Sequence, residues 1–412
     1  MSIAAAAARV VASGFVRSGR LRRCRGERHF VVALVTAAVV VNACGFAEPA
    51  LQPLTNESLD RVVIPPVEGK TASFDIMAVD QDAHRLYAAD TLDQGVDVVD
   101  ISVRPGRYLR TIPLTAPPKG LALVGALHRL FTGNDDSTVS VIDTDPASAR
   151  PFAVLATVST NGKGPADLLD YDTRDHTLFV ANRDDGFLSA VDVIKNVVVG
   201  KIPNLGLIEQ PRYDPIDGTV YVVSSDRNSI FQIDAHNYAP VREYQLPVVC
   251  EPHGLAINPA IDQGLIGCGD KDNLVTLVWD FRAKRVVRSF DLAGGGDSVI
   301  FDQKAQHFYF AAQDFTPPEI AVFNAAPITF LTAVPTSHHS RTLGYDEAHG
   351  LIYTFDGLHL EAALWAFPDP VAGCFGAEAQ RASAGASRSQ TPHCHPPKSA
   401  ARSRNAPTPR HG

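Results

Sequence analysis

The chain has 412 residues, of which 45% are hydrophobic and 20% charged, an ordinary composition for a globular protein with a formal net charge of −8. Residues 1–47 hold seven basic groups and one acid, and residues 374–412 hold six and one, which leaves 24 basic and 43 acidic groups in residues 48–373. A central region that acidic repels phosphate backbones, so nucleic acid is not an expected partner.

The N-terminal 47 residues have the pattern of an export signal. An Arg-rich stretch precedes the apolar run Phe30–Val41, and small residues follow it. Two processing routes are open: residues 41–44 resemble a lipoprotein signal in which Cys44 is acylated, and ordinary cleavage after Ala47 is the alternative. The apolar run is short for a membrane span, which argues against an uncleaved anchor. We expect an extracytoplasmic protein, in the periplasm, on the cell surface or secreted, with membrane contact only through a lipid on Cys44.

Residues 56–370 repeat one pattern seven times. Each copy has an inner segment, a turn, an apolar-aromatic run, a polar loop and a closing strand, which ends on an acidic or amide residue in six copies and runs through Phe367 in the degenerate seventh. Several short strands repeated at about 40–45 residues are typical of β-propeller blades. We therefore predict an all-β fold, a seven-bladed β-propeller of four-stranded antiparallel blades. The closing residues cap the next turn in this interpretation, and they are Asp100, Asp143, Asp192, Asp234, Asp280 and Asn324.

The two ends of the repeat region predict how the ring closes. The seventh copy supplies only three strands before Pro368, a residue that cannot continue a ladder. Upstream of the first copy, residues 59–64 form a strand without a partner, so we expect this N-terminal strand to complete the last blade and remove two exposed edges. Residues 374–412 are rich in Ser, Ala, Pro and Arg, and we expect a disordered tail.

The apolar-aromatic runs carry a family resemblance. They include Arg-Leu-Tyr87-Ala-Ala, Thr-Leu-Phe179-Val-Ala-Asn182 and Leu-Ile-Tyr353-Thr-Phe. Together with the closing strands and the repeat length, they resemble the YVTN-repeat family of seven-bladed propellers, which includes the YncE-like exported proteins. The resemblance implies an exported propeller with a binding role rather than a defined activity.

Two cysteines fall inside the fifth copy. Cys250 and Cys268 lie at opposite ends of an expected antiparallel strand pair, and export permits a disulfide between them. The alternative is a soft metal site made by both cysteines and His253, but it has fewer ligands than a closed structural site requires.

One position in each copy points to a site. In each copy, this position lies four residues before the aromatic or aliphatic residue that precedes the first turn. The seven positions are separated by 44, 48, 42, 44, 44 and 44 residues. Equivalent positions on the innermost strands of a propeller converge near its axis, so we expect these side chains to form a ring at the channel mouth. This mouth ring consists of Asp75, Lys119, Asp167, Glu209, His253, Asp297 and Arg341.

The mouth ring leaves several alternatives open. In one, Arg341 and Lys119 pair with the carboxylates beside them and plug the mouth. In another, a divalent metal (Ca²⁺, Mn²⁺ or Zn²⁺) or a cationic ligand relieves the repulsion within the rest of the ring. In a third, His253 is a general base, oriented by Glu209 or Asp297, in a lactonase or lyase. The remaining arc, without a basic partner, is Asp167, Glu209, His253 and Asp297.

The loops after the second strands add acidic residues to the same face. Turn chemistry explains them, and attraction of a basic protein or cationic small molecule is the functional alternative. His338 and His339 lie on the same rim. We predict an exported binding or scaffold protein whose acidic mouth holds a metal, a small ligand or a protein partner, with a metal- or His-dependent lactonase or lyase as the alternative. The loop acids are Asp90, Asp135, Asp136, Asp184, Asp185, Asp226, Asp270, Asp314 and Asp356.

Overall fold

The computed structural model describes residues 60–65, 73–355 and 363–372. The export signal predicted at residues 1–47, with the lipidation of Cys44, and the tail predicted at 374–412 lie outside these residues. Within the described part of the chain, no helix has the length and apolar character needed to cross a membrane.

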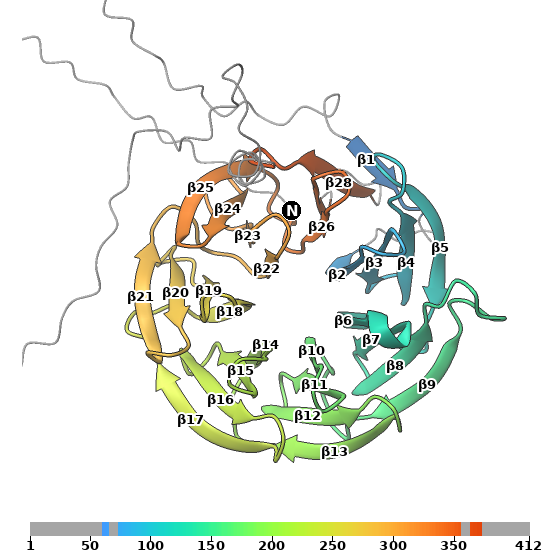
Figure 1. Cartoon of the computed structure of the whole chain (residues 1–412), viewed down its shortest axis with the longest axis horizontal. Helices are drawn as coiled ribbons and strands as arrows, with labels where there is room; N and C mark the ends of the chain where they lie inside the picture. Colours follow the sequence, from blue (N-terminus) through green and yellow to red (C-terminus); the bar gives the residue numbers. More distant parts are fainter. Residues whose placement is uncertain (1–59, 66–72, 356–362, 373–412) are drawn as a thin grey trace, which may run out of the picture. The chain divides into compact units, whose positions relative to one another are not determined.

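The described strands form seven four-stranded antiparallel sheets around a central axis (Figure 1). The first blade contains β2 (Phe74–Asp80), β3 (Arg85–Asp90), β4 (Gly95–Asp100) and β5 (Arg107–Pro113). The second contains β6 (Pro118–Val124), β7 (Arg129–Asn134), β8 (Thr138–Asp143) and β9 (Val154–Ser159), with the short 3-10 helix η1 (Gly125–Leu127). The third contains β10 (Leu169–Asp172), β11 (Thr177–Asn182), β12 (Phe187–Asp192) and β13 (Val197–Ile202).

The remaining blades repeat this order from the axis outward. The fourth contains β14 (Ile208–Asp214), β15 (Thr219–Ser224), β16 (Ser229–Asp234) and β17 (Ala239–Gln245). The fifth contains β18 (Pro252–Asn258), β19 (Gln263–Cys268), β20 (Thr276–Asp280) and β21 (Arg285–Phe290). The sixth contains β22 (Val299–Asp302), β23 (His307–Ala312), β24 (Glu319–Ala325) and β25 (Ile328–Pro335). The seventh contains β26 (Gly344–Asp346), β27 (Leu351–Phe355), β28 (Ala363–Pro368) and β1 (Asp60–Val63).

Strand β1 closes the ring as the outer strand of the seventh blade. It pairs antiparallel with β28, with Asp60 opposite Ala366, and the sheet order is β1-β28-β27-β26. Val62 is buried in one hydrophobic cluster with Leu364 of β28. The predicted N-terminal closure is therefore confirmed, and it provides a partner for an edge of β28 that would otherwise be exposed.

The second strand of each blade forms the core because neighbouring blades cover both of its faces. The aromatic or aliphatic residue of the repeated run is fully buried in every blade, and burial of such a side chain contributes roughly 1.5–3 kcal/mol to stability. These residues are Tyr87, Phe131, Phe179, Tyr221, Ile266, Tyr309 and Tyr353.

The acidic residues that close the third strands cap turns, as predicted. The Asp192 carboxylate accepts hydrogen bonds from the backbone N–H groups of Ile194 and Lys195, both at 2.9 Å. Asp234 accepts from the N–H of His236 at 2.9 Å in the same way. Their recurrence thus comes from turn geometry rather than catalysis.

Cys250 and Cys268 form a disulfide with an S–S distance of 2.01 Å. It joins the segment before β18 to the end of β19, and both residues are fully buried. Because both sulfur atoms are used in this bond, the alternative metal site of two thiolates with His253 is wrong.

Candidate functional site

Four mouth-ring residues lie at irregular positions near the start of the innermost strands, and the other three, Asp167, Asp297 and Arg341, lie just before these strands. The register between first and second strands shifts between Phe74 and Met77, and again between Pro252 and Gly254. The inner strands that carry Lys119 and Glu209 shift at the same place. A bulge breaks the strict alternation of side chains, so a mouth-ring residue and its successor can both face the channel.

The mouth-ring side chains of different blades lie near one another. Arg341 Nη2 lies 3.4 Å from Asp75 Oδ2, which joins the seventh blade to the first. His253 lies between two blades, with Nε2 4.0 Å from Glu209 Oε1 and Nδ1 3.9 Å from Asp297 Oδ1. The spacing of the repeats therefore does bring these residues to one place.

Lys119 does not contact the carboxylates beside it in the ring. Its Nζ lies 3.4 Å from Oδ1 of Asp135, the residue that follows β7. The predicted plug is thus right for Arg341 and Asp75 and wrong for Lys119, because a loop acid of its own blade lies closer.

Arg183 is a functional candidate that the sequence analysis missed. Its Nε donates a hydrogen bond to Glu209 Oε1 at 2.6 Å, and its Nη1 lies 2.9 Å from Asp184 Oδ1. The prediction that the arc from Asp167 to Asp297 has no basic partner is therefore wrong. A signal was present, because Arg183 follows the second strand of its blade just as Asp135 does, and residues there reach the mouth ring.

Burial dominates the titration of the mouth carboxylates. It raises the pKa of Asp167 to about 7, and the charges of Asp75 and Asp297 add to the effect. Burial also raises the pKa of Asp75 to about 6, although Arg341 opposes the shift. Because Asp297 influences carboxylates of two other blades, these groups share one electrostatic environment.

Glu209 is the titrating member of its pair with Arg183, since a guanidinium stays charged at physiological pH. Burial raises the pKa of Glu209 to about 8, and the Arg183 charge and hydrogen bond act in the opposite direction. Burial alone would lower the pKa of Arg183, but the charge and hydrogen bond of Glu209 outweigh burial and hold this pKa above its usual range.

This pair gives the first prediction. Replacing Arg183 with methionine should raise the pKa of Glu209 further, because its favourable charge and hydrogen bond are lost. When the folded-state pKa of a carboxyl is raised, the protein loses stability as the pH rises toward that pKa. The variant should therefore be destabilised relative to wild type more at pH 9 than at pH 6, by roughly 1–3 kcal/mol. Urea unfolding at both pH values measures this. An equal loss at both would show that Glu209 does not ionise in this range.

Burial favours the neutral form of the His253 imidazole. Burial lowers its pKa, although Asp297 acts in the opposite direction. A Cβ atom added to Gly269 would lie 2.9–3.0 Å from three atoms of the imidazole, so the ring packs directly against this glycine. The neutral form has one nitrogen free to accept a proton, but neither carboxylate neighbour is within hydrogen-bonding distance.

No group of three or more His, Cys, Asp or Glu side chains in the described residues is arranged to hold a metal ion. Asp167, Glu209, His253 and Asp297 therefore do not form a preformed metal site in the described structure. Binding of Ca²⁺, Mn²⁺ or Zn²⁺ would require these side chains to move together.

Most acids of the surrounding loops are already engaged. Asp226 accepts the backbone N–H of Leu207 at 2.7 Å, and Asp314 lies 3.3 Å from Lys271. Asp356 lies outside the described residues.

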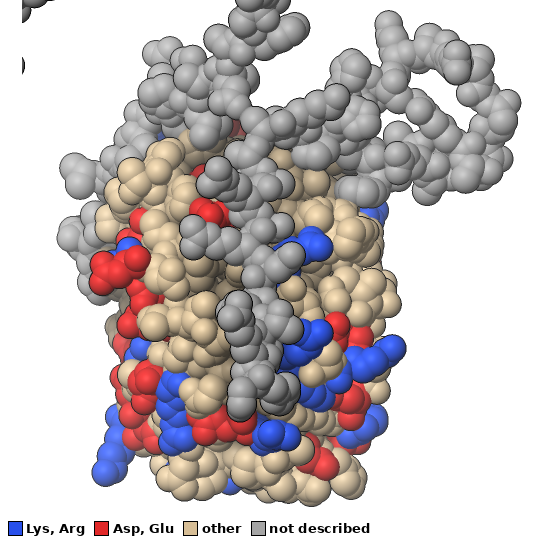
Figure 2. Space-filling view, turned by 90° about the vertical axis from the view of Figure 1, so that its left-hand side faces the viewer, with Lys and Arg blue, Asp and Glu red and all other residues tan. Residues whose placement is uncertain are grey.

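His338 is exposed and its Nδ1 lies 3.0 Å from the carbonyl of Gln313. Acidic and basic side chains are also interspersed on the flank shown in Figure 2. Turn chemistry and local pairing thus explain these acids.

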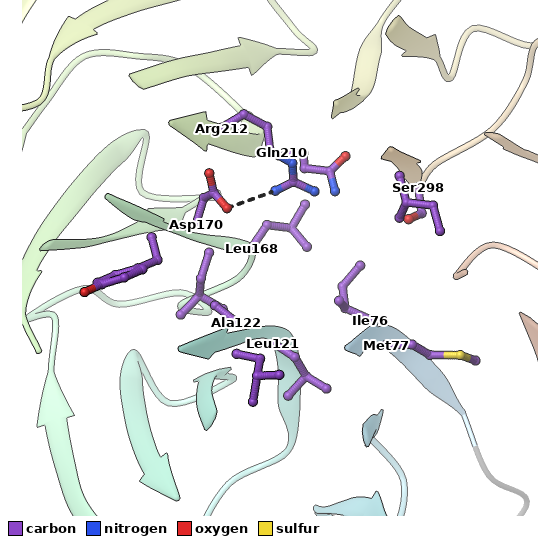
Figure 3. A pocket seen from close by; sticks show the side chains of 13 residues that line it. Ile76, Met77, Leu121, Ala122, Leu168, Asp170, Gln210, Arg212 and Ser298 are labelled. Carbon is purple, nitrogen blue, oxygen red and sulfur yellow. Dashed lines mark ion pairs between the residues drawn. The ribbon is translucent and has the colours of Figure 1, made fainter. Parts of the chain in front are cut away.

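A cavity of about 200 Å³ lies between the innermost strands of several blades (Figure 3). Several of its lining residues immediately follow mouth-ring residues in sequence, as expected from the bulged inner strands. Those residues are Ile76, Leu168, Gln210 and Ser298.

These features define the chain as a seven-bladed β-propeller with a charged ring and a cavity on its axis. No family model and no curated protein matches the sequence. Among solved structures, a chain in the "Crystal Structure of Mitotic Checkpoint Complex" is similar at 14% identity and a TM-score of 0.58, covering 77% of this chain and 97% of that one. A chain in the "Structure of U3-55K" is similar at 11% identity and a TM-score of 0.60, covering 75% and 98%.

At such identities the similarity shows the fold alone. Both neighbours are propellers of the WD40 type, and the resemblance to the YVTN and YncE-like proteins is not confirmed.

Proposed function

We propose that this protein is a binding scaffold that holds a cationic side chain of a protein partner at its mouth ring. The observation that carries the proposal is Asp167. Its carboxylate is partly buried, and within the described residues no basic group lies within ion-pair distance of it. Burial and the carboxylates of Asp75 and Asp297 raise its pKa to about 7, although the more distant charges of Lys119 and Arg183 act in the opposite direction. An ammonium or guanidinium group in direct contact with Asp167 would relieve the remaining repulsion.

The fold supports a protein partner. The propeller is consistent with a binding or scaffold role, and one structural neighbour belongs to a complex by its title. The mouth ring is carried by the innermost strands of hydrogen-bonded sheets, so it can bind a partner without a large change of its own backbone.

We place the protein outside the cytoplasm, with a lipid at Cys44 or a cleaved signal, on the strength of its N-terminal sequence. The disulfide between Cys250 and Cys268 supports this location, because such bonds persist in oxidising compartments.

The second prediction tests the mouth with a short peptide of alanine and lysine. A carboxyl with a pKa of about 7 is roughly one-tenth ionised at pH 6 and nine-tenths at pH 8, so the affinity should rise roughly tenfold over that range. Isothermal titration calorimetry at several pH values measures it, with a norleucine peptide as the uncharged control.

A matched pair of variants locates the binding. Asp167→Asn should weaken peptide binding and reduce its pH dependence, and the remainder should come from Asp75 and Glu209, whose pKa values of about 6 and about 8 lie in the same range. Asp272→Asn, a change to an exposed acid in the loop after β19, should leave both unchanged. A pH-independent affinity, or equal binding by wild type and Asp167→Asn, would contradict the proposal.

The neutral imidazole of His253 between two carboxylates favours one second candidate, a lactonase- or lyase-type enzyme. Turnover of a panel of lactones that disappears in a folded His253→Ala variant would support the enzyme. One equivalent of a divalent metal in the purified protein, lost on chelation together with several degrees of melting temperature, would support a metal in this role.

A further inference from the structure

The axial cavity carries one acid and one base that are only loosely paired. Arg212 Nη1 lies 4.0 Å from Asp170 Oδ1, which is beyond hydrogen-bonding distance. The same nitrogen donates to the carbonyl of Pro211 at 2.8 Å, and Asp170 Oδ2 accepts the backbone N–H of Tyr213 at 2.6 Å. The well-formed bond between Arg183 and Glu209, at 2.6 Å, shows what a direct pair looks like in this protein.

Arg212 has unused donors toward the cavity. Within the described residues, its guanidinium has no hydrogen-bond acceptor other than Pro211. The Arg212 side chain is 21% exposed, and both Arg212 and Asp170 line the cavity (Figure 3). Burial lowers the pKa of Arg212 and raises that of Asp170, so each charge lacks part of the stabilisation that water or a close partner would provide.

Gln210 adds a second group with spare capacity. The residue is only 3% exposed, and its Oε1 accepts the backbone N–H of Leu255 at 2.8 Å. No described residue accepts a hydrogen bond from its Nε2, which belongs to a side chain lining the cavity. This N–H group can therefore donate to an acceptor that enters the cavity.

Aliphatic side chains and Tyr171 complete the wall, and polar atoms contribute a large part of the surface that faces the cavity. Figure 3 shows Asp170, Gln210, Arg212 and Ser298 along one side of the cavity and the aliphatic side chains along the other. A cavity of about 150 Å³ in another protein holds benzene, so the present volume of about 200 Å³ suits a molecule of amino-acid size. The larger aliphatic residues are Ile76, Met77, Leu121, Leu123, Leu168, Leu169 and Ile300.

We propose that this cavity binds a small zwitterion of the α-amino-acid type with an apolar side chain. The ligand carboxylate would accept hydrogen bonds from Arg212 and Gln210, its ammonium would face Asp170, and its side chain would lie against the aliphatic wall. A ligand of net charge zero matches the pair of opposite charges, whereas a simple anion would leave Asp170 beside a second negative group. This binding site is separate from the mouth ring and does not depend on the peptide binding proposed for it.

The test uses L-leucine as the probe and the full-length protein. Isothermal titration calorimetry should detect leucine binding below about 10 mM. Leucinamide lacks the carboxylate and 4-methylpentanoate lacks the ammonium, so each should bind at least roughly tenfold more weakly. These comparisons need no variant and remain informative if substitutions in the channel disturb folding.

Substitutions then assign the groups. Arg212→Gln should weaken leucine binding roughly tenfold or more, while Arg285→Gln on the outer strand β21 should leave it unchanged. No leucine binding would overturn the proposal, and so would unchanged binding by a folded Arg212→Gln variant. Equal binding of 4-methylpentanoate would also overturn it, because the site would then recognise an anion and not a zwitterion.

Discussion

Replacing Asp369 with alanine is expected to lower the free energy of unfolding by roughly 2–4 kcal/mol. Asp369 follows the closing strand β28 and is 6% exposed. Its Oδ2 accepts hydrogen bonds from the hydroxyls of Tyr309 at 2.7 Å and Tyr345 at 3.4 Å, and lies 3.3 Å from His307 Nδ1. The Asp369 carboxylate therefore connects the end of β28, in the seventh blade, to the sixth blade. Its loss leaves the hydroxyls of Tyr309 and Tyr345 without this acceptor.

The contribution of Asp369 should depend on pH. Burial alone would raise its pKa, but hydrogen bonds from His307, from the N–H of Val371 and from Tyr309 outweigh it and lower the pKa. A carboxyl with a lowered folded-state pKa stabilises the protein above its ordinary pKa and loses that effect as pH falls through the folded value. Wild type and variant should therefore differ most near neutral pH and converge in acid.

Urea unfolding followed by fluorescence measures both effects. Asp291→Ala provides the control, because Asp291 is exposed and should change stability by less than about 0.5 kcal/mol. An Asp369→Ala variant as stable as this control would show that β1 and β28 hold the ring closed without the buried network.

Replacing Gly254 with alanine is expected to destabilise the channel wall by roughly 1–3 kcal/mol. A Cβ atom there would lie 2.4 Å from the carbonyl oxygen of Asp297, 2.6 Å from Val299 Cγ2 and 2.9 Å from Val299 N. These atoms belong to β22 and the residues just before it, so the fifth and sixth blades would have to separate at the axis. Gly120 has the same role one half-ring away, since its Cβ would lie 2.2 Å from the carbonyl oxygen of Asp167.

The Gly254 variant should also disturb the mouth, because Asp297 and His253 lie on either side of the contact. Thermal melting measures the stability, and an NMR titration of His253 measures its surroundings. Gly125→Ala is the matched control, because nothing lies within 4 Å of the added atom. Equal melting temperatures for Gly254→Ala and Gly125→Ala would show that the blades can adjust without cost.

The seven-fold repeat was sufficient to predict the blades and their closure. Strand pairing inside a blade is local, and the alternation of buried and exposed residues along each strand appears directly in the sequence. The lone strand now seen at residues 60–63 had to pair somewhere, and a seventh copy with three strands had one free edge. Equal spacing also identified the mouth ring, because residues in a common register of a closed ring face the same axis.

The contacts of the mouth were decided by the tertiary structure. Lys119 binds Asp135 rather than its ring neighbours, and Arg183 reaches Glu209 from a loop of another blade. Such contacts depend on the direction of long side chains and on bulges of a single residue, which periodicity does not specify. The axial cavity is the clearest case. Asp170 and Arg212 lie in neighbouring repeats, and only the packing of the third blade against the fourth sets them 4.0 Å apart in a cavity where neither is closely paired with the other.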